Sequence, residues 1–366
     1  MSKNSESPKK LLIFGPCPAN AGGIEKNIQE TLKIIDSCQI ISATLICFSK
    51  SFFKMKVNPY KKVKVYSINQ NFFLFYIRNL YKIIKKEREN VDYVHIHGTG
   101  NFESFLVSFF LRKFSYILTP HYHPKGSNHL FNLLKQIYDP IFVKYQLKKS
   151  KKIICVSEIE RGIILQKFGK SLSDKIEIIP NGVDIERIQK AKRIPGYNNL
   201  ILYVGRLEKH KNVNVLIKIF KNFPKNYQLL IIGSGKERSS LHNLVAEYNL
   251  FDRVHFKENL SDDEIYCWMR TCSVFINFSD IEAFGISVLE ALVLNKPVVV
   301  NNRLGLSELA KKFPEAICAV DIHSENNHDL VQYIINAENK SFLLDLKEYS
   351  WKRITQKLLD TYRGSR

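Results

Sequence analysis

Short runs of β-branched and other apolar residues alternate along this chain with amphipathic helical stretches, and this alternation constrains its fold more than any other feature. It is the pattern of parallel strands covered by helices, the doubly wound α/β class. A polar stretch containing Pro195 and Gly196 interrupts the pattern, which then restarts at Leu200. We therefore predict two facing Rossmann-like domains, residues 1–192 and 193–350, with an interdomain cleft.

The apolar runs define the expected elements. In the first domain we expect strands at Lys10–Phe14, Ile40–Phe48, Val63–Ser67, Val91–His97, Tyr116–Pro120, Ile153–Val156 and Ile176–Ile179, and helices at Ile24–Ile35, Leu74–Lys86, Phe102–Phe114 and Leu130–Lys148. In the second we expect strands at Leu200–Val204, Gln228–Ile232, Val254–Phe256, Val274–Phe278, Pro297–Asn301 and Ala316–Val320. In such sheets ligands bind outside the carboxyl ends of the strands.

Charge is distributed unevenly along the chain. Its 366 residues contain 55 Lys and Arg against 35 Asp and Glu, a net charge of +20. Residues 1–200 hold 33 basic and 15 acidic residues (+18), whereas residues 201–366 hold 22 and 20 (+2). Such an excess indicates an anionic partner, which could be a nucleic acid, an anionic membrane or a phosphorylated substrate. We expect the first domain to meet that partner.

Some classes of protein do not fit this sequence. The seven cysteines are scattered and form no CxxC motif, which argues against a disulfide scaffold or a structural zinc site. The polar residues 1–10 lack the apolar core of a signal peptide, and no uncharged apolar run approaches the roughly 18 residues of a spanning helix. We therefore expect a cytoplasmic protein with reduced thiols.

Two segments of the second domain carry groups suited to binding a phosphate and a sugar. Gly205, Arg206 and Lys211 lie between a strand and a helix, where free amides and two cations make an anion site, although an ordinary basic loop has the same composition. Glu282 and Glu290 flank a helix start expected near residue 285. These carboxylates could accept hydrogen bonds from sugar hydroxyl groups, or they could merely compensate the helix dipole.

Histidines cluster at two strand ends of the first domain. His95 and His97 end one strand, and His121 and His123 follow another, so a two-histidine metal pair is conceivable, but no further ligand is obviously placed. A neutral histidine that exchanges one hydrogen bond with a substrate fits the edge of a sheet better. For His95 we favour simple packing.

The motifs of the chain, taken in order, resemble those of one known family. They are Gly22-Gly23-Ile24-Glu25, His121 after a strand, Val156-Ser157, Ile179-Pro180-Asn181-Gly182-Val183-Asp184, Val204-Gly205-Arg206-Leu207 with Lys211, Ile232-Gly233-Ser234-Gly235, and Glu282-Ala283-Phe284-Gly285 through Glu290. This set resembles the retaining, GT-B fold glycosyltransferases of family 4 over about residues 10–310 and again at the C-terminus. Each motif is modest alone, whereas their order is specific.

The resemblance implies roles for residues of the second domain, as the donor-binding domain. Arg206 and Lys211 would neutralise the diphosphate of a UDP- or GDP-sugar, stabilising the leaving group. Glu290 would bind the ribose, and Glu282 would bind the hydroxyls of the donor sugar. The other donor-binding residues implied are Gly205, Gly233 and, near the base, Phe256, together with the amide-bearing Phe284, Gly285 and Ile286.

For the first domain the resemblance implies an acceptor-binding role. His121 would touch the transferred sugar, and Gly22 and Gly23 would approach the diphosphate or the acceptor. The C-terminal helix, residues 351–366, would return to pack on this domain.

The implied reaction requires no metal and no other cofactor, because Arg206 and Lys211 can replace a divalent ion. It retains the anomeric configuration by attack on the leaving-group face, and the departing phosphate accepts the proton of the acceptor. One departure concerns the segment from Asn301 to Glu308, which has one glycine where the family usually has a glycine-rich turn.

A glycan or lipid-linked acceptor is the expected partner of the basic first domain. Residues 72–86 combine aromatic side chains with Arg78, Lys82, Lys85 and Lys86, as in a helix lying in a bilayer interface. A sheet-covering helix with a solvated basic end has the same pattern. We expect peripheral association with the inner face of the cytoplasmic membrane, in polysaccharide, glycolipid or protein-glycan assembly.

Two other functions are open on the sequence alone. A pI near 9.5 would suit a nucleic-acid-binding protein, but the chain has no helix-turn-helix, RRM, KH or zinc-finger pattern, so no nucleic acid is expected as a partner. The same fold could also serve a sugar-nucleotide epimerase or a phosphorylase. The paired Glu282 and Glu290 with Arg206 and Lys211 favour sugar transfer.

Overall fold

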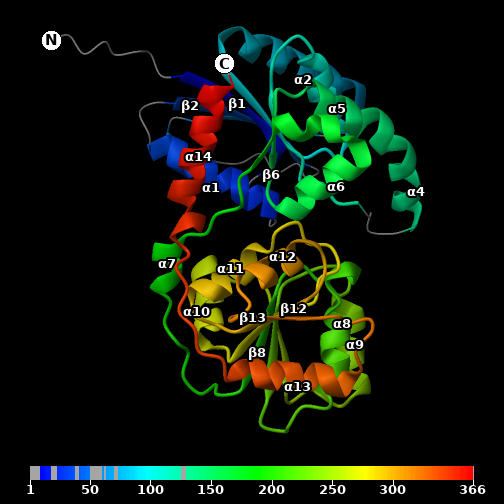
Figure 1. Ribbon diagram of the computed structural model, residues 1–366, viewed down its shortest axis with the longest axis vertical. Helices are drawn as coiled ribbons and strands as arrows, with labels where there is room; N and C mark the ends of the chain where they lie inside the picture. Colours follow the sequence, from blue (N-terminus) through cyan, green and yellow to red (C-terminus); the bar gives the residue numbers. More distant parts are fainter. Residues whose placement is uncertain are drawn as a thin grey trace, which may run out of the picture. The chain divides into compact units, whose positions relative to one another are not determined.

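Two units, each built on one parallel sheet, make up the computed structural model (Figure 1). The structure describes residues 9–17, 23–37, 41–49, 60–61, 63–69, 73–124 and 129–365. Unit 1 comprises residues 1–181 and 351–366, and unit 2 comprises residues 182–350. The boundary that the sequence placed after residue 192 therefore falls inside unit 2, because the short helix α7 (Ile185–Gln189) packs on helices of that unit.

A seven-stranded sheet forms the centre of unit 1, with the order β3-β2-β1-β4-β5-β6-β7 and parallel pairing throughout. Its strands are β1 (Lys9–Pro16), β2 (Ile41–Ser49), β3 (Val63–Asn69), β4 (Tyr93–His97), β5 (Ile117–Thr119), β6 (Lys152–Cys155) and β7 (Ile176–Ile178). The order reverses between β1 and β4, which is the switch point where doubly wound sheets bind ligands.

Both faces of this sheet are buried, because side chains alternate along a strand. In β1, Leu12 and Phe14 join one apolar cluster, and Leu11 and Ile13 join another on the opposite face. Helices α2, α3, α5 and α6 contribute to the first cluster, and α1 and α14 to the second. The helical segments are α1 (Gly23–Ser37), α2 (Phe73–Glu87), η1 (Arg88–Asn90), α3 (Phe102–Phe110), α4 (His129–Tyr138), η2 (Asp139–Val143), α5 (Lys144–Lys149), α6 (Glu158–Phe168), η3 (Lys170–Lys175) and α14 (Trp351–Gly364).

The last helix of the chain, α14, belongs to unit 1. It lies beside α1 (Figure 1), and Trp351, Ile354, Leu358 and Tyr362 are buried among residues of α1 and β1. The Tyr362 ring stacks on Tyr93 of β4 with a centroid distance of 5.7 Å. The C-terminal segment is therefore part of the core of unit 1.

Unit 2 has a six-stranded parallel sheet with the order β10-β9-β8-β11-β12-β13. Its strands are β8 (Leu200–Val204), β9 (Gln228–Ile232), β10 (Val254–Lys257), β11 (Val274–Asn277), β12 (Val298–Asn301) and β13 (Ile317–Val320). Helices α8, α9 and α13 bury one face in a single apolar cluster, and α10, α11 and α12 connect the strands beyond β10. These segments are η4 (Lys209–Lys211), α8 (Val213–Phe220), α9 (Arg238–Glu247), α10 (Asp262–Thr271), α11 (Ile286–Val293), α12 (Leu304–Lys312), α13 (Asn327–Glu338) and η5 (Lys347–Tyr349).

Two helices differ from the sequence prediction. The helix expected to reach residue 114 ends at Phe110, and Phe114 closes a turn by donating its amide to the Leu111 carbonyl at 2.7 Å. The single helix expected over residues 130–148 is interrupted by the π-helix η2, which contains Pro140. Proline cannot donate the backbone hydrogen bond that a continuous α-helix requires there.

All of the net positive charge of the chain lies in unit 1. Unit 1 contains 34 Lys and Arg against 14 Asp and Glu (+20), whereas unit 2 contains 21 of each (0). The difference is sharper than the sequence halves indicated, because α14 adds basic residues to unit 1. The surplus positive charge is thus a property of one folded body.

The packing of α14 predicts how each unit responds to a cavity. Ile354→Ala in unit 1 should cost about 2–5 kcal/mol, because the side chain is fully buried. Hydrogen exchange should then accelerate in β1 and remain unchanged in β8. Ile334→Ala, a matched change in α13 of unit 2, should do the reverse. Equal loosening of both sheets by either variant would contradict this division of the core.

Candidate functional site

Two glycine-bearing loops of unit 2 lie against each other at the carboxyl ends of β8 and β9. The Gly205 amide donates to the Ile232 carbonyl at 3.0 Å, and the Leu207 amide donates to the Ser234 carbonyl at 2.8 Å. A Cβ on Gly233 would collide with the carbonyl oxygen of Gly205. The predicted site residues Gly205 and Gly233 are therefore in contact, and glycine is required because the backbones approach so closely.

An ion pair joins the loop after β8 to the loop after β11. Lys211 Nζ lies 2.5 Å from Glu282 Oε2, and the two side chains are 12% and 25% exposed. Asn212, in the left-handed conformation (φ 53°), ends η4 and donates its side-chain amide to the Phe278 carbonyl at 2.9 Å. Lys211 and Glu282, which the sequence predicted in separate motifs, are thus in direct contact.

Arg206 and Lys211 make this edge of the sheet electropositive. Arg206 is exposed, and its carbonyl oxygen accepts a hydrogen bond from Tyr203 Oη at 2.9 Å. Burial raises the pKa of Tyr203, and the Glu282 carboxylate raises it further. Burial lowers the pKa of His210, and the charges of Lys211 and Arg206 lower it further. His210, which stands between Arg206 and Lys211 in the sequence, is therefore neutral and adds no charge to this edge.

The amino end of α11 provides backbone donors beside the ion pair. Gly285 precedes the helix in the left-handed conformation (φ 96°) and accepts from the amides of Val288 and Leu289. The amides of Ile286 and Ser287 open the first turn, where a helix offers no internal acceptor. These donors and the helix dipole favour an oxyanion at this position.

The loop that departs from the family pattern keeps its one glycine where the site requires it. The Gly305 amide donates to the Glu282 carbonyl at 3.0 Å. A Cβ at Gly305 would collide with the carbonyl oxygen of Ala283. The segment between Asn301 and Glu308 therefore supports the backbone that carries Glu282.

Glu290 lies inside α11 and is nearly buried, at 6% exposure. Its Oε1 accepts a hydrogen bond from Tyr266 Oη of α10 at 3.3 Å. The sequence placed Glu282 in the loop and Glu290 in the helix, and the structure has the same arrangement. Phe284 is buried and packs near Tyr349, with a ring-centroid distance of 6.1 Å, which leaves its backbone at the helix start.

Asp280 is a residue of this site that the sequence analysis missed. Its carboxylate accepts from Asn301 Nδ2 at 2.8 Å and contacts His323 Nε2 at 2.7 Å, and its amide donates to the His210 carbonyl. Burial alone would raise the pKa of Asp280, but hydrogen bonds from Asn212, His323 and Asn301 hold it below its ordinary value. Its place just after β11, two residues before Glu282, was the available signal.

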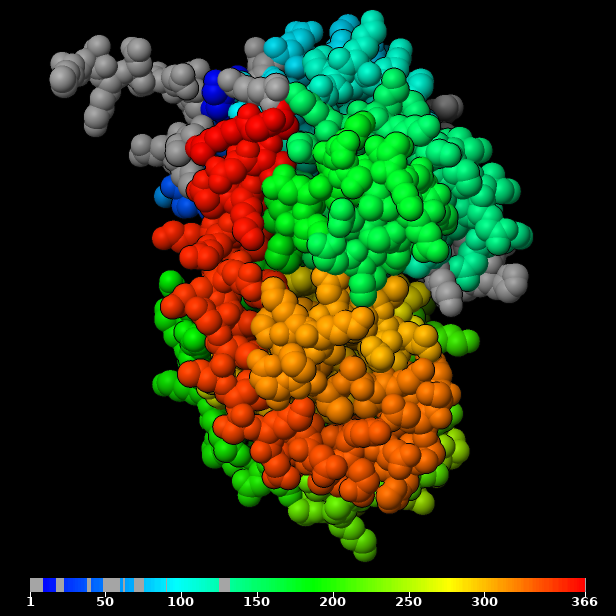
Figure 2. Space-filling view, in the orientation of Figure 1, coloured from blue at the N-terminus to red at the C-terminus, as the bar shows by residue number. Residues whose placement is uncertain are grey.

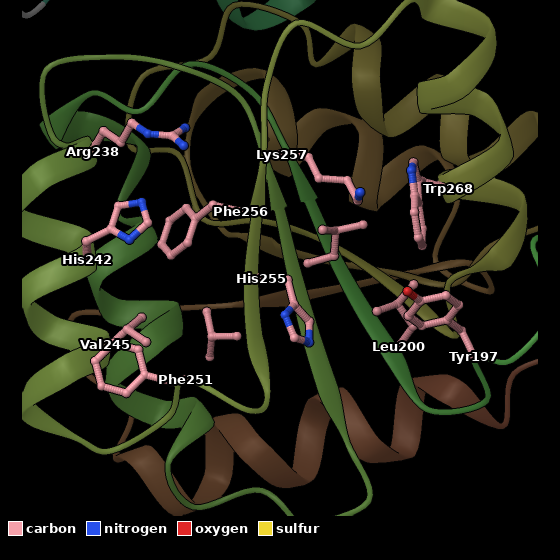
Figure 3. Close-up of a pocket in the computed structure, with 12 residues that line it drawn as sticks. Tyr197, Leu200, Arg238, His242, Val245, Phe251, His255, Phe256, Lys257 and Trp268 are labelled. Atoms are coloured by element: carbon pink, nitrogen blue, oxygen red, sulfur yellow. The ribbon is translucent and has the colours of Figure 1, made fainter.

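A pocket of about 450 Å³ lies along the edge strand β10 of unit 2 (Figure 3). Phe256 lines it and stacks on His242 with a centroid distance of 4.1 Å, and Lys257 and Trp268 line it on the other side of the strand. The pocket adjoins the glycine loop, because the Gly233 amide donates to the Lys257 carbonyl at 2.9 Å. Phe256 is thus linked to the rest of the site through Gly233.

In unit 1, three histidines form a column of neighbouring rings at the carboxyl ends of β4 and β5. The rings of His95 and His97 are 4.1 Å apart, and those of His97 and His121 are 5.7 Å apart. His95 bonds to Tyr362 Oη at 2.8 Å through Nδ1 and to Thr119 Oγ1 at 2.7 Å through Nε2. His95 is therefore packed in the core and hydrogen-bonded on both ring nitrogens, which agrees with the packing role that we favoured.

These histidines are neutral over the physiological range. Burial lowers the pKa of His95 to about 3, and burial with the neighbouring imidazoles lowers the pKa of His97 and His121 well below 6.5. His121 also adopts a left-handed backbone conformation (φ 47°), which is uncommon outside glycine and frequent at functional sites. Glu160 steadies this turn by accepting from the amides of Tyr122 and Val156.

The remaining predicted positions of unit 1 are only partly described. Gly22 lies outside the described residues, and Gly23 begins α1. Asn27 of that helix donates to Asn181 at 2.7 Å, which ties α1 to the Pro-Asn-Gly motif. Within the residues that the structure describes, no group of three or more His, Cys, Asp or Glu side chains could hold a metal ion.

Two family models match most of the chain. The model described as Glycosyltransferase Family 4 matches residues 44–187, and the model described as Glycosyl transferases group 1 matches residues 184–353. The chain belongs to glycosyltransferase family 4. It is 27% identical to an uncharacterized glycosyltransferase of Methanocaldococcus jannaschii over 93% of this chain and 94% of that protein.

Other relatives of this family 4 member match shorter stretches and have named activities. An O-antigen chain mannosyltransferase of Salmonella typhimurium is 28% identical over 50% of each chain. An N-acetylgalactosamine-N,N'-diacetylbacillosaminyl-diphospho-undecaprenol 4-alpha-N-acetylgalactosaminyltransferase of Campylobacter jejuni is 34% identical over 40% of each chain. Both names describe the transfer of a sugar, one to an O-antigen chain and the other to a sugar carried on diphospho-undecaprenol.

Solved structures share the GT-B fold with this glycosyltransferase. Sucrose-phosphate synthase of Thermosynechococcus elongatus superposes with a TM-score of 0.77 at 17% identity, over 97% of this chain and 98% of that one. Anabaena HepE, solved with UDP and glucose, superposes with a TM-score of 0.75 at 18% identity, over 97% and 100%. The predicted architecture of two parallel-sheet α/β domains is confirmed.

The histidine column predicts a loss of stability in mild acid. Between pH 6.5 and about 3 an unfolded His95 binds a proton that the folded one does not, and burial acts on His97 and His121 in the same direction. The unfolding free energy of unit 1 therefore has its full value above pH 6.5 and decreases below it, by about 1.4 kcal/mol per pH unit for His95. Glu160, whose pKa burial raises to about 7, opposes this decline between pH 7 and 4.5, but it is one group against three.

Denaturant unfolding should show this decline between about pH 7 and about pH 5. Trp351 reports on unit 1 if Trp268 of unit 2 is replaced by Phe, since the chain has two tryptophans. Glu160→Gln should make the decline steeper. A stability that stays constant or rises as the pH falls over this range would contradict the neutral state of the three buried histidines.

Proposed function

We propose that this enzyme is a retaining, metal-independent glycosyltransferase that moves a hexose-type sugar from a nucleotide-sugar donor to a glycan or lipid-linked acceptor. Unit 2 would bind the donor and unit 1 the acceptor. One observation carries the proposal, namely the ion pair of Lys211 and Glu282 beside the free amides of α11 and the exposed Arg206. Two cations, the backbone N–H groups of α11 and the Glu282 carboxylate then lie at one edge of the unit 2 sheet.

The donor diphosphate would bind Arg206, Lys211 and the amides of Ile286 and Ser287. These groups would stabilise the negative charge that grows on the departing phosphate, and preorganised donors of this kind lower a barrier most where charge develops. Two cations can supply the neutralisation that a divalent metal supplies elsewhere, which is the basis for proposing metal independence.

The two carboxylates would hold the sugar parts of the donor. Glu282 would accept hydrogen bonds from hydroxyl groups of the transferred sugar, and Glu290 would accept them from the ribose. The hydrogen bond from Tyr266 would hold the Glu290 carboxylate in place. A carboxylate bound to Lys211 is a weaker nucleophile than a free one, so we assign Glu282 to binding rather than to covalent catalysis.

We propose that the anomeric configuration is retained by attack on the leaving-group face. The bond from the anomeric carbon to the phosphate oxygen breaks, the bond to the acceptor oxygen forms, and the acceptor proton passes to the departing phosphate. His121, neutral and at the edge of the unit 1 sheet, would hydrogen-bond the transferred sugar. Gly22 and Gly23 would approach the diphosphate or the acceptor.

The nucleoside would lie near Gly233 and Phe256. HepE was solved with UDP and glucose, whereas a relative in Xanthomonas oryzae is named for GDP-mannose, so both nucleotides are candidates. The pocket along β10 adjoins Gly233 and offers aromatic and basic side chains to a base.

We propose a lipid-linked acceptor and peripheral association with the inner face of the cytoplasmic membrane. Two relatives are named for undecaprenol or polyprenol diphosphates, and unit 1 carries the whole +20 charge. None of the helices within the described residues is long and apolar enough to cross a bilayer. Duplex or single-stranded nucleic acid is not an expected partner.

A thermal-shift panel of UDP-, GDP- and ADP-sugars tests donor binding. The correct donor at about 100 times its dissociation constant should add about 2.7 kcal/mol, which corresponds to a rise in Tm on the order of 5 °C. Addition of EDTA should leave the shift unchanged. If no nucleotide sugar stabilises the protein, the assignment of unit 2 is refuted.

Substitutions at the ion pair test the site itself. Lys211→Ala and Glu282→Gln should each lower kcat/KM by about 100- to 1,000-fold, because each removes a group that acts on the donor in the transition state. Lys209→Ala removes an exposed charge from the same turn and is the matched control. Turnover should be measured with the nucleotide sugar that gives the thermal shift described in the previous paragraph. Normal activity of Lys211→Ala with a normal fold would contradict the diphosphate role.

A further inference from the structure

Helices on one face of the unit 1 sheet present a connected set of aromatic rings. The rings of Phe105 and Phe142 are 4.5 Å apart, those of Tyr138 and Phe142 4.8 Å, and those of Tyr81 and Phe110 5.4 Å. Further ring contacts of 6.0 to 6.3 Å extend the set along α3. We call these rings the aromatic surface, and its members are Tyr81, Phe102, Phe105, Phe109, Phe110, Tyr138, Phe142 and Tyr145.

Aliphatic side chains extend this surface along α4 and into η2. Leu133 and Leu134 are each 52% exposed, Ile137 is 65% exposed and Ile141 is 57% exposed. Figure 2 shows this teal-to-green part of the chain at the surface of unit 1. Single exposed apolar residues need no explanation, but a contiguous group of them marks an interaction site.

Part of the apolar stripe of α2, the helix predicted to contact the membrane, lies in the core of unit 1. In α2, Tyr76, Leu80 and Ile84 are buried in the core of unit 1. The apolar stripe of α2 therefore covers the sheet, which was the alternative explanation of its pattern. Residue 72 lies outside the described residues.

Basic residues outnumber acidic ones in the segment that carries the aromatic and aliphatic side chains. Residues 102–152 contain nine Lys and Arg but only Glu103 and Asp139 as acids. Asp139 is fully buried and bonded to Tyr122 and Lys167, so it adds little negative charge to the surface. The Arg112 guanidinium lies over the Phe109 ring at 4.9 Å, which brings a cation to the edge of the apolar group.

We propose that α3, α4 and η2 form a docking surface for an anionic lipid bilayer. Apolar side chains flanked by lysine and arginine match the acyl region and the headgroups of such a membrane. A second copy of this chain is disfavoured because two units of charge +20 repel each other. A nucleic acid would use the rings but not the exposed leucines and isoleucines of α4 and η2.

This surface deepens the proposed action on a lipid-linked acceptor, and its test reads lipid binding alone. The purified full-length chain is sedimented with vesicles of equal parts phosphatidylcholine and phosphatidylglycerol, and with vesicles of phosphatidylcholine only. We expect binding to the anionic vesicles that weakens as salt is raised. Equal binding to both, or to neither, would overturn the proposal.

Two sets of substitutions separate the apolar and electrostatic contributions. Leu134→Gln with Ile137→Gln and Ile141→Gln should lower binding to anionic vesicles about 10-fold or more, while salt dependence persists. All three sites are exposed, and glutamine is compatible with a helix. Binding at the wild-type level by this folded variant would contradict the docking surface.

The electrostatic set is Arg112→Gln with Lys148→Gln and Lys149→Gln, three exposed sites. It should lower binding about 10-fold at low salt and reduce the salt dependence.

Controls in unit 2 are Leu343→Gln with Phe251→Gln, which are exposed apolar sites, and Lys221→Gln with Lys225→Gln, which are exposed basic sites. Both controls should bind vesicles like the wild type.

Other occupants would give different results in the same variants. If the wild type were a dimer that the apolar triple variant made monomeric, a second copy would cover this surface and the proposal would fail. Tight single-stranded DNA binding that the apolar variant lost would overturn it likewise. Donor-induced thermal shifts should be normal in both docking variants, and Lys211→Ala should bind vesicles normally, so the docking surface and the proposed sugar transfer fail independently.

Discussion

The ion pair between Lys211 and Glu282 joins two loops whose residues are 71 positions apart in the sequence. Both loops are at the carboxyl edge of the unit 2 sheet, and each is held by its own contacts, Asn212 to the Phe278 carbonyl and Gly305 to the Glu282 carbonyl. Because each member of the pair is partly buried, removing one leaves the other charge poorly compensated. The positions of Arg206, the α11 amides and Glu290 all depend on these two loops staying together.

Alternation of apolar runs was sufficient to predict every strand in the part of the chain that the structure describes, because strands buried on both faces read as continuous apolar segments. Local turn chemistry also placed the start of α11 at Gly285. Contacts between distant segments could not be predicted in this way. The pairing of Lys211 with Glu282, the support of that loop by Gly305, and the anchoring of His95 by Tyr362 all arise from tertiary packing. The apolar stripe of α2 showed the same limit, since periodicity does not distinguish a core face from a membrane face.

The division of charge gives the two units different physical characters. Unit 2 is neutral and has two cations, Arg206 and Lys211, where one diphosphate would bind, whereas unit 1 carries +20 and an exposed apolar surface on α3 and α4. A soluble donor requires only a few local charges. A partner that is extended, anionic and apolar in its interior would use both features of unit 1, which is why we connect them with a bilayer and a lipid-linked acceptor.

A crystal structure of the protein with a bound nucleotide sugar would test the central claim most directly. We expect the diphosphate oxygens about 3 Å from Lys211 Nζ and the Arg206 guanidinium, the hexose hydroxyls on Glu282, and the ribose on Glu290. Such a complex should contain no metal ion between the phosphates and the protein. A nucleotide bound through other residues, with the Lys211 and Glu282 side chains paired only to each other, would contradict the account.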